Sequence, residues 1–223
     1  MPESALGRAP AMTQVLLAGA TGLVGGLVLS QLLLDERVTR VVAPTRRPLP
    51  MTHARLFNPV VDFDALPADA DCWRVDSVIC ALGTTMRQAD SRAAFRRVDH
   101  DYPVAIARHA LSGGALAYAL NSATGADVAS RFFYNRVKGE VERDLDALGY
   151  LSLTVVRPGL IEGERAQRRT GEHLAGLALH ALAPVLPRRF RPSPADHVAA
   201  ALVDAALNAR PGHHVIEAAQ LAR

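Results

Sequence analysis

The chain has little cysteine: only Cys72 and Cys80 occur among its 223 residues. Two thiols are too few for the disulfide framework of a small secreted domain, and they fall short of a four-ligand zinc site. We therefore predict that both thiols are buried and that the protein has no metal site.

Long apolar runs are also missing. No stretch reaches the roughly 18 apolar residues of a membrane-spanning helix, and the first ten residues, MPESALGRAP, lack the apolar centre of a signal peptide. We therefore expect a cytoplasmic protein with no integral membrane association. Residues 1–12 are predicted to be a disordered tail.

Neither sign of charge dominates the composition. The formal net charge is +3, with 21% charged and 49% hydrophobic residues, which is typical of globular proteins. So small an excess gives no reason to expect a nucleic-acid partner. Residues 13–223 are interpreted as a single domain, in which residues 160–223 form a cap on the substrate side.

The most informative stretch is TQVLLAGATGLVGG at residues 13–26, in which an apolar run ends in three regularly spaced glycines. Gly19 lets the chain turn, Gly22 leaves room for a pyrophosphate, and Gly25 lets the following helix pack closely. Free N–H groups at the start of that helix attract an anion. We assign cofactor contacts to the three glycines and to Thr21, Leu23 and Val24; a turn without a ligand is the alternative.

Strands and helices alternate after this turn, which is typical of a parallel sheet covered on both faces. The predicted later strands cover residues 38–43, 58–63, 75–82, 116–121 and 152–156. The first predicted helix follows the glycine turn and ends near 35–37, and a second covers 92–111, with Pro103 as a kink or restart. Another contains Tyr134 and Lys138. Two more are predicted at 172–186 and from 192–196 through 207. The fold class is therefore α/β: a Rossmann-like doubly wound parallel sheet with helices on both faces and a small C-terminal helical substrate region.

Candidate ligand-binding residues follow the predicted strands, where such sheets bind their ligands. Besides the glycine turn, the cofactor contacts assigned in this way are Arg46, Arg47, Asp62, Phe63, Ala81, Leu82, Gly83 and Pro158. About 20 residues beyond the glycines, where NAD enzymes place a carboxylate for the ribose, this chain has arginines. A guanidinium suits a 2′-phosphate, so we predict NADP(H) in preference to NAD(H); an exposed arginine pair without a ligand is the alternative.

Tyr134 and Lys138 are four residues apart and therefore share one face of a helix, while Ser122 ends the preceding strand. A phenol titrates near pH 10, and a neighbouring ammonium favours its ionised form. We predict that Tyr134 exchanges a proton with the substrate, that Lys138 supplies the charge and holds the nicotinamide ribose, and that Ser122 orients a carbonyl oxygen. Packing of Tyr134 beside a surface lysine is the alternative.

Several motifs resemble the atypical short-chain dehydrogenase/reductases, and among them the Tat-interacting-protein-like oxidoreductases. They are GATGLVGG (19–26), CALGTT (80–85), VDHDY (98–102), Ser122 with GAD (125–127), FFYNRVKGEVE (132–142) and RPGLIEGER (157–165). The resemblance implies a Rossmann-like fold, NADPH, and catalytic roles for Ser122, Tyr134 and Lys138. Where extended members often carry a proton-relay asparagine, this chain offers Asp99 or His100.

The first functional hypothesis is an NADPH-dependent oxidoreductase that acts on a small carbonyl or alcohol, with a homodimer as one possible assembly. The second is a cofactor-binding regulator with little turnover, because one fold serves many functions. An epimerase or dehydratase would require a larger substrate lobe than the residues after Pro158 provide.

Overall fold

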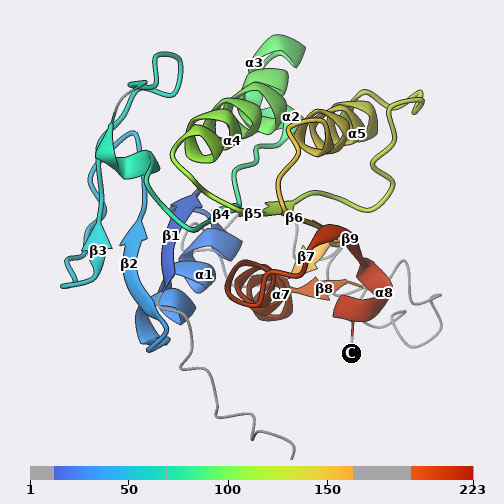
Figure 1. The fold of residues 1–223 in the computed structure, drawn as a ribbon. Coiled ribbons are helices and arrows are strands. Elements are labelled where there is room, and N and C mark those ends of the chain that lie inside the picture. Colours follow the sequence, from blue (N-terminus) through green and yellow to red (C-terminus); the bar gives the residue numbers. More distant parts are fainter. Residues whose placement is uncertain (1–12, 69, 163–191, 223) are drawn as a thin grey trace, which may run out of the picture.

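The computed structural model describes residues 13–68, 70–162 and 192–222. Its centre is a seven-stranded sheet in the order β3-β2-β1-β4-β5-β6-β9 (Figure 1), and every neighbouring pair is parallel. The strands are β1 (Thr13–Ala18), β2 (Val38–Val42), β3 (Leu56–Phe57), β4 (Ser77–Cys80), β5 (Ala117–Asn121), β6 (Ser152–Arg157) and β9 (Gly212–Glu217). Two short strands, β7 (Ile161–Glu162) and β8 (Ser193–Pro194), pair separately.

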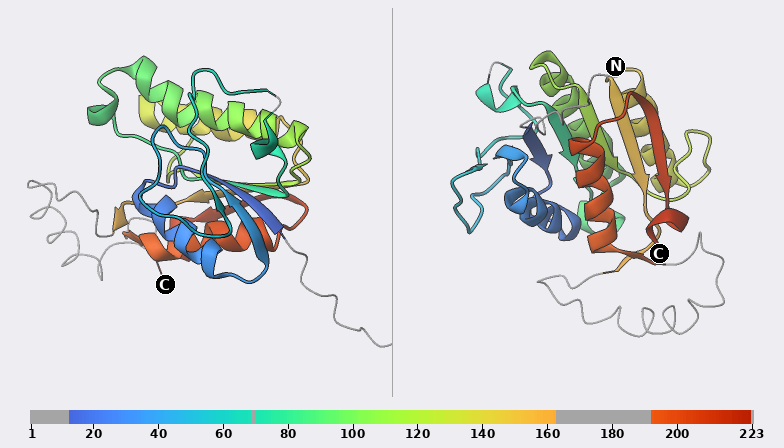
Figure 2. Two further views of the ribbon diagram at one scale, coloured as in Figure 1. Left: turned by 90° about the vertical axis from the view of Figure 1, so that its left-hand side faces the viewer. Right: turned by 60° about the horizontal axis from the view of Figure 1, so that its bottom comes forward.

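Helices cover both faces of this sheet (Figure 2). On one face α1 (Leu23–Leu34) packs against α7 (Ala195–Leu207), while α4 (Tyr102–Ser112) and α5 (Phe133–Asp146) cover the other. The shorter helical segments are η1 (Asp71–Trp73), α2 (Met86–Ala89), α3 (Arg92–Arg96), the π turn η2 (Arg97–Asp101) and α8 (Ala218–Leu221). The predicted Rossmann-like α/β fold is thereby confirmed.

The central strands are almost entirely buried, because each face of the sheet has its own apolar layer. In β4 all four residues are buried. Leu32 of α1 and Leu202 of α7 belong to one apolar cluster, whereas Ile106 of α4 and Leu145 of α5 belong to the other. Two separate layers of this kind hold the carboxyl ends of the strands in fixed positions along one edge of the sheet.

The turn between β1 and α1 depends on two glycines. Gly19 has a φ of +92°, and a Cβ there would lie 2.6 Å from the backbone carbonyl carbon of Ala81. A Cβ on Gly25 would lie only 2.0 Å from the carbonyl oxygen of Gly19. The helix α1 then begins after Gly22 with no side chain bonded to its first N–H groups, so these donors remain available to an anion.

The third strand differs from its prediction. Strand pairing beside β2 covers Leu56–Phe57, and the predicted segment 58–63 retains only a single bridge between Val60 and Thr45. Pro59 has no N–H to donate to a ladder, and the amide of Asn58 is bonded to the Ala43 carbonyl and the Thr45 hydroxyl. The predicted strand at 58–63 is therefore wrong in position.

The long helix predicted at 92–111 is a continuous helical stretch with a π turn in its middle. Residues of α3 lead into η2, and α4 follows with Pro103 in its first turn. Pro103, predicted as a kink or restart, thus lies where regular α-helix resumes after the π turn. The predicted helix at 172–186 and the tail at 1–12 lie outside the described residues.

Candidate functional site

A cavity of about 530 Å³ opens at the carboxyl ends of β1, β4, β5 and β6. Many of the site residues predicted from the sequence line this cavity. They are Gly22, Leu23, Val24, Ala81, Leu82, Gly83, Ser122, Tyr134, Lys138 and Pro158. The cavity thus joins the glycine turn to the predicted Tyr134 and Lys138 pair, although these lie more than a hundred residues apart in the chain.

Other predicted contacts lie elsewhere. Gly19 and Gly25 build the turn beneath the cavity, and exposed Thr21 belongs to the same turn. Neither these three nor Arg46, Arg47, Asp62 and Phe63 line the cavity. Arg46 and Arg47 are exposed on the loop that follows β2.

The assignment of Phe63 to the cofactor does not fit the structure. Its side chain is buried, and its ring centroid lies 5.4 Å from that of Tyr102. The neighbouring carboxylate of Asp62 accepts a hydrogen bond from the Asp64 backbone N–H at 2.9 Å. Phe63 is therefore a core residue whose ring packs beside Tyr102 at the start of α4.

Tyr134 and Lys138 lie one turn apart at the start of α5, and their environments differ. Tyr134 is 37% exposed and its ring lies 5.6 Å from that of Phe95. Lys138 is buried at 4% exposure, and its Nζ lies 2.8 Å from Asp99 Oδ1. Burial, the largest single influence, lowers the pKa of Lys138, but the Asp99 charge, Tyr134 and the hydrogen bond to Asp99 together raise it overall, so the lysine is charged.

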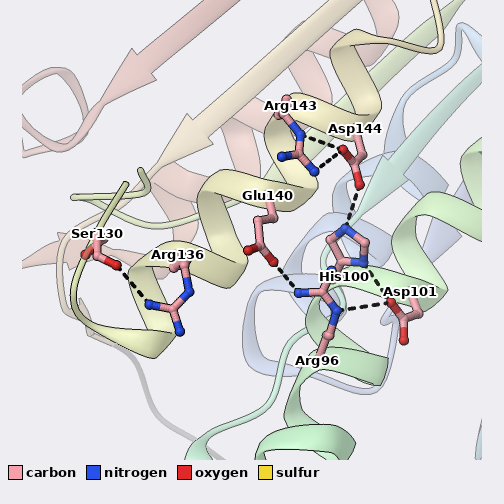
Figure 3. A network of polar contacts seen from close by, with 8 residues as sticks. All are labelled: Arg96, His100, Asp101, Ser130, Arg136, Glu140, Arg143 and Asp144. Carbon is pink, nitrogen blue, oxygen red and sulfur yellow. Dashed lines mark hydrogen bonds and ion pairs between the residues drawn. The ribbon is translucent and has the colours of Figure 1, made fainter. Parts of the chain in front are cut away.

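Asp99 reaches Lys138 from the π turn η2. Its other oxygen, Oδ2, accepts a hydrogen bond from the Thr84 backbone N–H at 2.8 Å. His100 does not line the cavity, because its ring lies between the carboxylates of Asp101 and Asp144 (Figure 3). Of the two candidates for a relay position, the structure therefore brings only Asp99 to the cavity.

Ser122 has a partner that the sequence analysis missed. Its hydroxyl donates to the carboxylate of Glu142, and Glu142 is ion-paired with Arg157 through Nη2 at 2.6 Å. The sequence does carry a signal for this contact, because Glu142 lies four residues beyond Lys138 and therefore on the same face of α5.

Further cavity residues were also missed: Thr84, Thr85, Met86, Gln88, Asn121, Ala123, Gly159, Leu160 and Ile161. Several of them directly follow or precede a predicted residue, so their position at a strand end was the available signal. Among the described residues, Asn121 Oδ1 is a buried atom with no hydrogen-bond partner.

Both cysteines are free and buried, as predicted. Burial raises the pKa of the Cys80 thiol, which keeps it protonated. Within 13–68, 70–162 and 192–222, no group of three or more His, Cys, Asp and Glu residues could hold a metal ion. In the same ranges, none of the helices has the length and apolarity needed to cross a membrane.

Comparison with curated proteins identifies close relatives, although no family model matches the chain. Protein fmp52 of Emericella nidulans, named as mitochondrial, is 35% identical over 184 residues, which are 78% of each protein. Protein HTATIP2 of Rattus norvegicus is 38% identical over 165 residues, covering 72% of this chain and 68% of the rat protein.

Solved structures share the fold at low sequence identity. MoeE5 in complex with UDP-glucose and NAD has a TM-score of 0.70 at 19% identity, covering 91% of this chain and 74% of that one. Bordetella bronchiseptica WbmG in complex with NAD has a TM-score of 0.66 at 13% identity, with 94% and 74% covered. A short-chain dehydrogenase family protein from Francisella tularensis has a TM-score of 0.68 at 15% identity, with 96% and 100% covered.

The prediction of a cytoplasmic protein is wrong in the light of these relatives, because the fungal FMP52 proteins are named as mitochondrial. The prediction rested on the missing apolar centre of a signal peptide. That criterion tests only for secretion, since sequences that direct proteins into organelles need no apolar segment.

The fold, the shared cavity and the relatives agree with the resemblance that the motifs showed. At 35% identity over 78% of both proteins, the match to fmp52 is too extensive to reflect a common fold alone. The chain belongs to the family of FMP52 and HTATIP2 within the atypical short-chain dehydrogenase/reductases.

Proposed function

We propose that this protein is an NADP(H)-dependent oxidoreductase that transfers hydride between the nicotinamide and a small carbonyl or alcohol. The observation that carries the proposal is the single cavity lined by Gly22, Gly83, Ser122, Tyr134 and Lys138. It combines an anion-binding helix start with a proton-transfer group and a cation.

The residues present fit a dinucleotide. The uncapped start of α1 and the absence of a side chain at Gly22 leave space and N–H donors for a pyrophosphate. Gly83 allows the backbone after β4 to approach a ribose, and Lys138 lies deeper in the same cavity. The cofactor would supply or accept the hydride when bound. Two structural neighbours with this fold were solved with NAD.

The loop after β2 supports the proposed preference for NADP(H) over NAD(H). Thr45, Arg46 and Arg47 offer two cations and no carboxylate at this position. The Thr45 hydroxyl donates to the Arg47 carbonyl at 2.7 Å, which fixes the backbone of the loop. In the described part of the chain, neither arginine side chain has an ion-pair partner, so both are available to a 2′-phosphate.

In this mechanism Tyr134 gives a proton to the substrate oxygen during reduction and takes it back during oxidation. Lys138 is the cation that would stabilise the Tyr134 phenolate, and the ammonium is itself held by Asp99. Met86, Leu160 and Ile161 add apolar side chains to the lining of this cavity.

The test is a screen of aldehydes, ketones and quinones for NADPH oxidation, with Tyr134→Phe as the matched variant. We expect turnover in the unmodified protein and a loss of about a thousandfold in kcat for the variant, since general acid catalysis typically contributes 10²–10⁴-fold. NADPH affinity should be unchanged. Full activity of Tyr134→Phe would remove the tyrosine from the mechanism.

A second candidate is a nucleotide-binding regulator with little turnover. It is favoured by the way the polar groups of the cavity are already paired, Lys138 with Asp99 and Ser122 with Glu142. Nucleotide binding measured by calorimetry without any carbonyl reduction across the screen would favour this candidate over the enzyme.

A further inference from the structure

Three polar side chains follow one another along one face of α5. Tyr134, Lys138 and Glu142 are spaced by four residues, so they project to the same side of the helix. Glu142 is 6% exposed and Ser122 is 4% exposed, and the Ser122 hydroxyl contacts the Glu142 carboxylate. Tyr134 and Lys138 line the cavity, and the next side chain on the same face of α5 is the buried carboxylate of Glu142.

Arg157 holds this carboxylate in one orientation. Its Nε lies 3.2 Å from both Glu142 oxygens, and its Nη2 lies 2.6 Å from Oε2. The same guanidinium reaches outward through Nη1 to Glu217 at 3.1 Å. A paired contact of this kind fixes the plane of the carboxylate, which leaves Oε1 directed at Ser122.

The direction of the Ser122 hydrogen bond follows from the chemistry of the two groups. A carboxylate has no hydrogen to give, so the serine donates its one hydrogen to Glu142. The Ser122 oxygen can then only accept further hydrogen bonds, through its lone pairs. While this bond exists, Ser122 has no hydrogen left for a ligand in the cavity that it lines.

We propose that Glu142, held by Arg157, is a positioning residue that fixes Ser122 as a hydrogen-bond acceptor toward the cavity. While Tyr134 is protonated, an alcohol can donate its one hydroxyl hydrogen to this acceptor, whereas a carbonyl oxygen needs a donor. The same hydrogen turns to the Tyr134 phenolate before oxidation. If the proposed oxidoreductase function is correct, the site therefore binds the alcohol form of a substrate in preference to the carbonyl form.

The hydroxyl orientation is tested by proton NMR of the full chain, with ¹³C-labelled serine and without any substrate. A hydrogen bond to a buried carboxylate slows hydroxyl exchange with water, so we expect a resolved hydroxyl proton that correlates with the Cβ of Ser122. It should be absent in Ser122→Ala and lost to exchange in Glu142→Gln, where the hydrogen faces the cavity. A hydroxyl proton that exchanges freely, or that is unaffected by Glu142→Gln, would overturn the proposal.

Glu142→Gln has a defined expected effect. The amide oxygen should remain with Arg157 Nη2, which turns the NH₂ group toward Ser122. The serine then accepts from the amide, and its hydrogen becomes available to the cavity. The matched control is Glu217→Gln, which removes the outer partner of Arg157 and leaves the Ser122 contact intact.

The substrate preference is tested with 1-phenylethanol and acetophenone as an alcohol and ketone of similar shape. The ratio of their KM values should change about tenfold in favour of the ketone in Glu142→Gln, since one hydrogen bond is at stake, and should not change in Glu217→Gln. An unchanged ratio in Glu142→Gln overturns the alcohol preference. Turnover of neither compound, with the expected NMR signal present, counts against the proposed function and leaves the orientation of Ser122 standing.

Discussion

The ammonium of Lys138 lies 2.8 Å from the carboxylate of Asp99, and both side chains are almost completely buried. One comes from α5 and the other from the π turn η2, so the pair joins the two helical segments beside the cavity. A buried ion pair of this kind is destabilised most when only one partner is removed, because the other charge is left without compensation.

Asp99→Asn should therefore reduce the free energy of unfolding by about 3 kcal/mol, measured by urea denaturation at pH 7. The raised pKa of Lys138 means that the contribution of the pair is complete below the ordinary lysine pKa of 10.5 and is lost as pH rises through the folded value. The difference between the variant and the unmodified protein should thus shrink as the solution becomes alkaline. Asp101→Asn, at a half-exposed carboxylate, is the control and should have a much smaller effect.

A second pH-dependent contribution comes from Asp144 on α5 (Figure 3). Burial tends to raise the pKa of this carboxyl, but hydrogen bonds from Arg143 and His100 lower it below 3.8 overall. Its stabilising contribution is therefore present above pH 3.8 and lost as pH falls through the folded value. Asp144→Asn should cost about 1 kcal/mol at pH 6, and in thermal unfolding the difference should shrink as the pH falls below 3.8. A constant difference at all pH values would contradict the assignment.

The glycine turn allows a paired experiment. Gly25→Ala places a Cβ 2.0 Å from the Gly19 carbonyl oxygen, so we expect a loss of about 3 kcal/mol in stability. Gly22→Ala meets only the same oxygen at 3.4 Å and should fold normally. Because Gly22 lines the cavity, its variant should still lose NADPH binding. Thermal unfolding and calorimetric titration separate the two effects, and retained nucleotide affinity in Gly22→Ala would contradict the proposed pyrophosphate position.

Arg46→Ala tests the proposed contact with the 2′-phosphate. Loss of one charge-assisted hydrogen-bonding group should weaken NADPH binding about tenfold and leave NADH binding unchanged. Arg74→Ala, at an exposed arginine paired with Asp71, serves as the matched control. Equal losses for the two nucleotides would remove Arg46 from cofactor selection.

The sequence was sufficient to predict the fold, because β1 and β4 are predominantly apolar and alternate with helical segments. It was less informative at the edges of the sheet. Pro59 and the side-chain bonds of Asn58 displaced the third strand. The strand β9 (Gly212–Glu217) was missed because it has only one neighbour and alternates with exposed residues, so its pattern is weakly apolar.

The cavity was predicted in outline for a similar reason, since residues at the carboxyl ends of parallel strands necessarily meet. The hydrogen-bond and ion-pair partners of the cavity side chains could not be predicted in this way. The contact of Ser122 with Glu142 depends on the rotation of α5 over β5, and that of Asp99 with Lys138 depends on a π turn that has no reliable sequence signature.

The π turn η2 also limits how this protein can change in length. A π turn contains one residue more than an α-helical turn, so deletion of a residue within Arg97–Asp101 would restore regular helix geometry locally. It would also change the direction in which the side chains of the former π turn project, so Asp99 would move away from Lys138. An insertion or deletion in this turn would therefore remove the negative charge of Asp99 from the cavity. Among the described residues, Asp99 is the only one of that turn that lines the cavity.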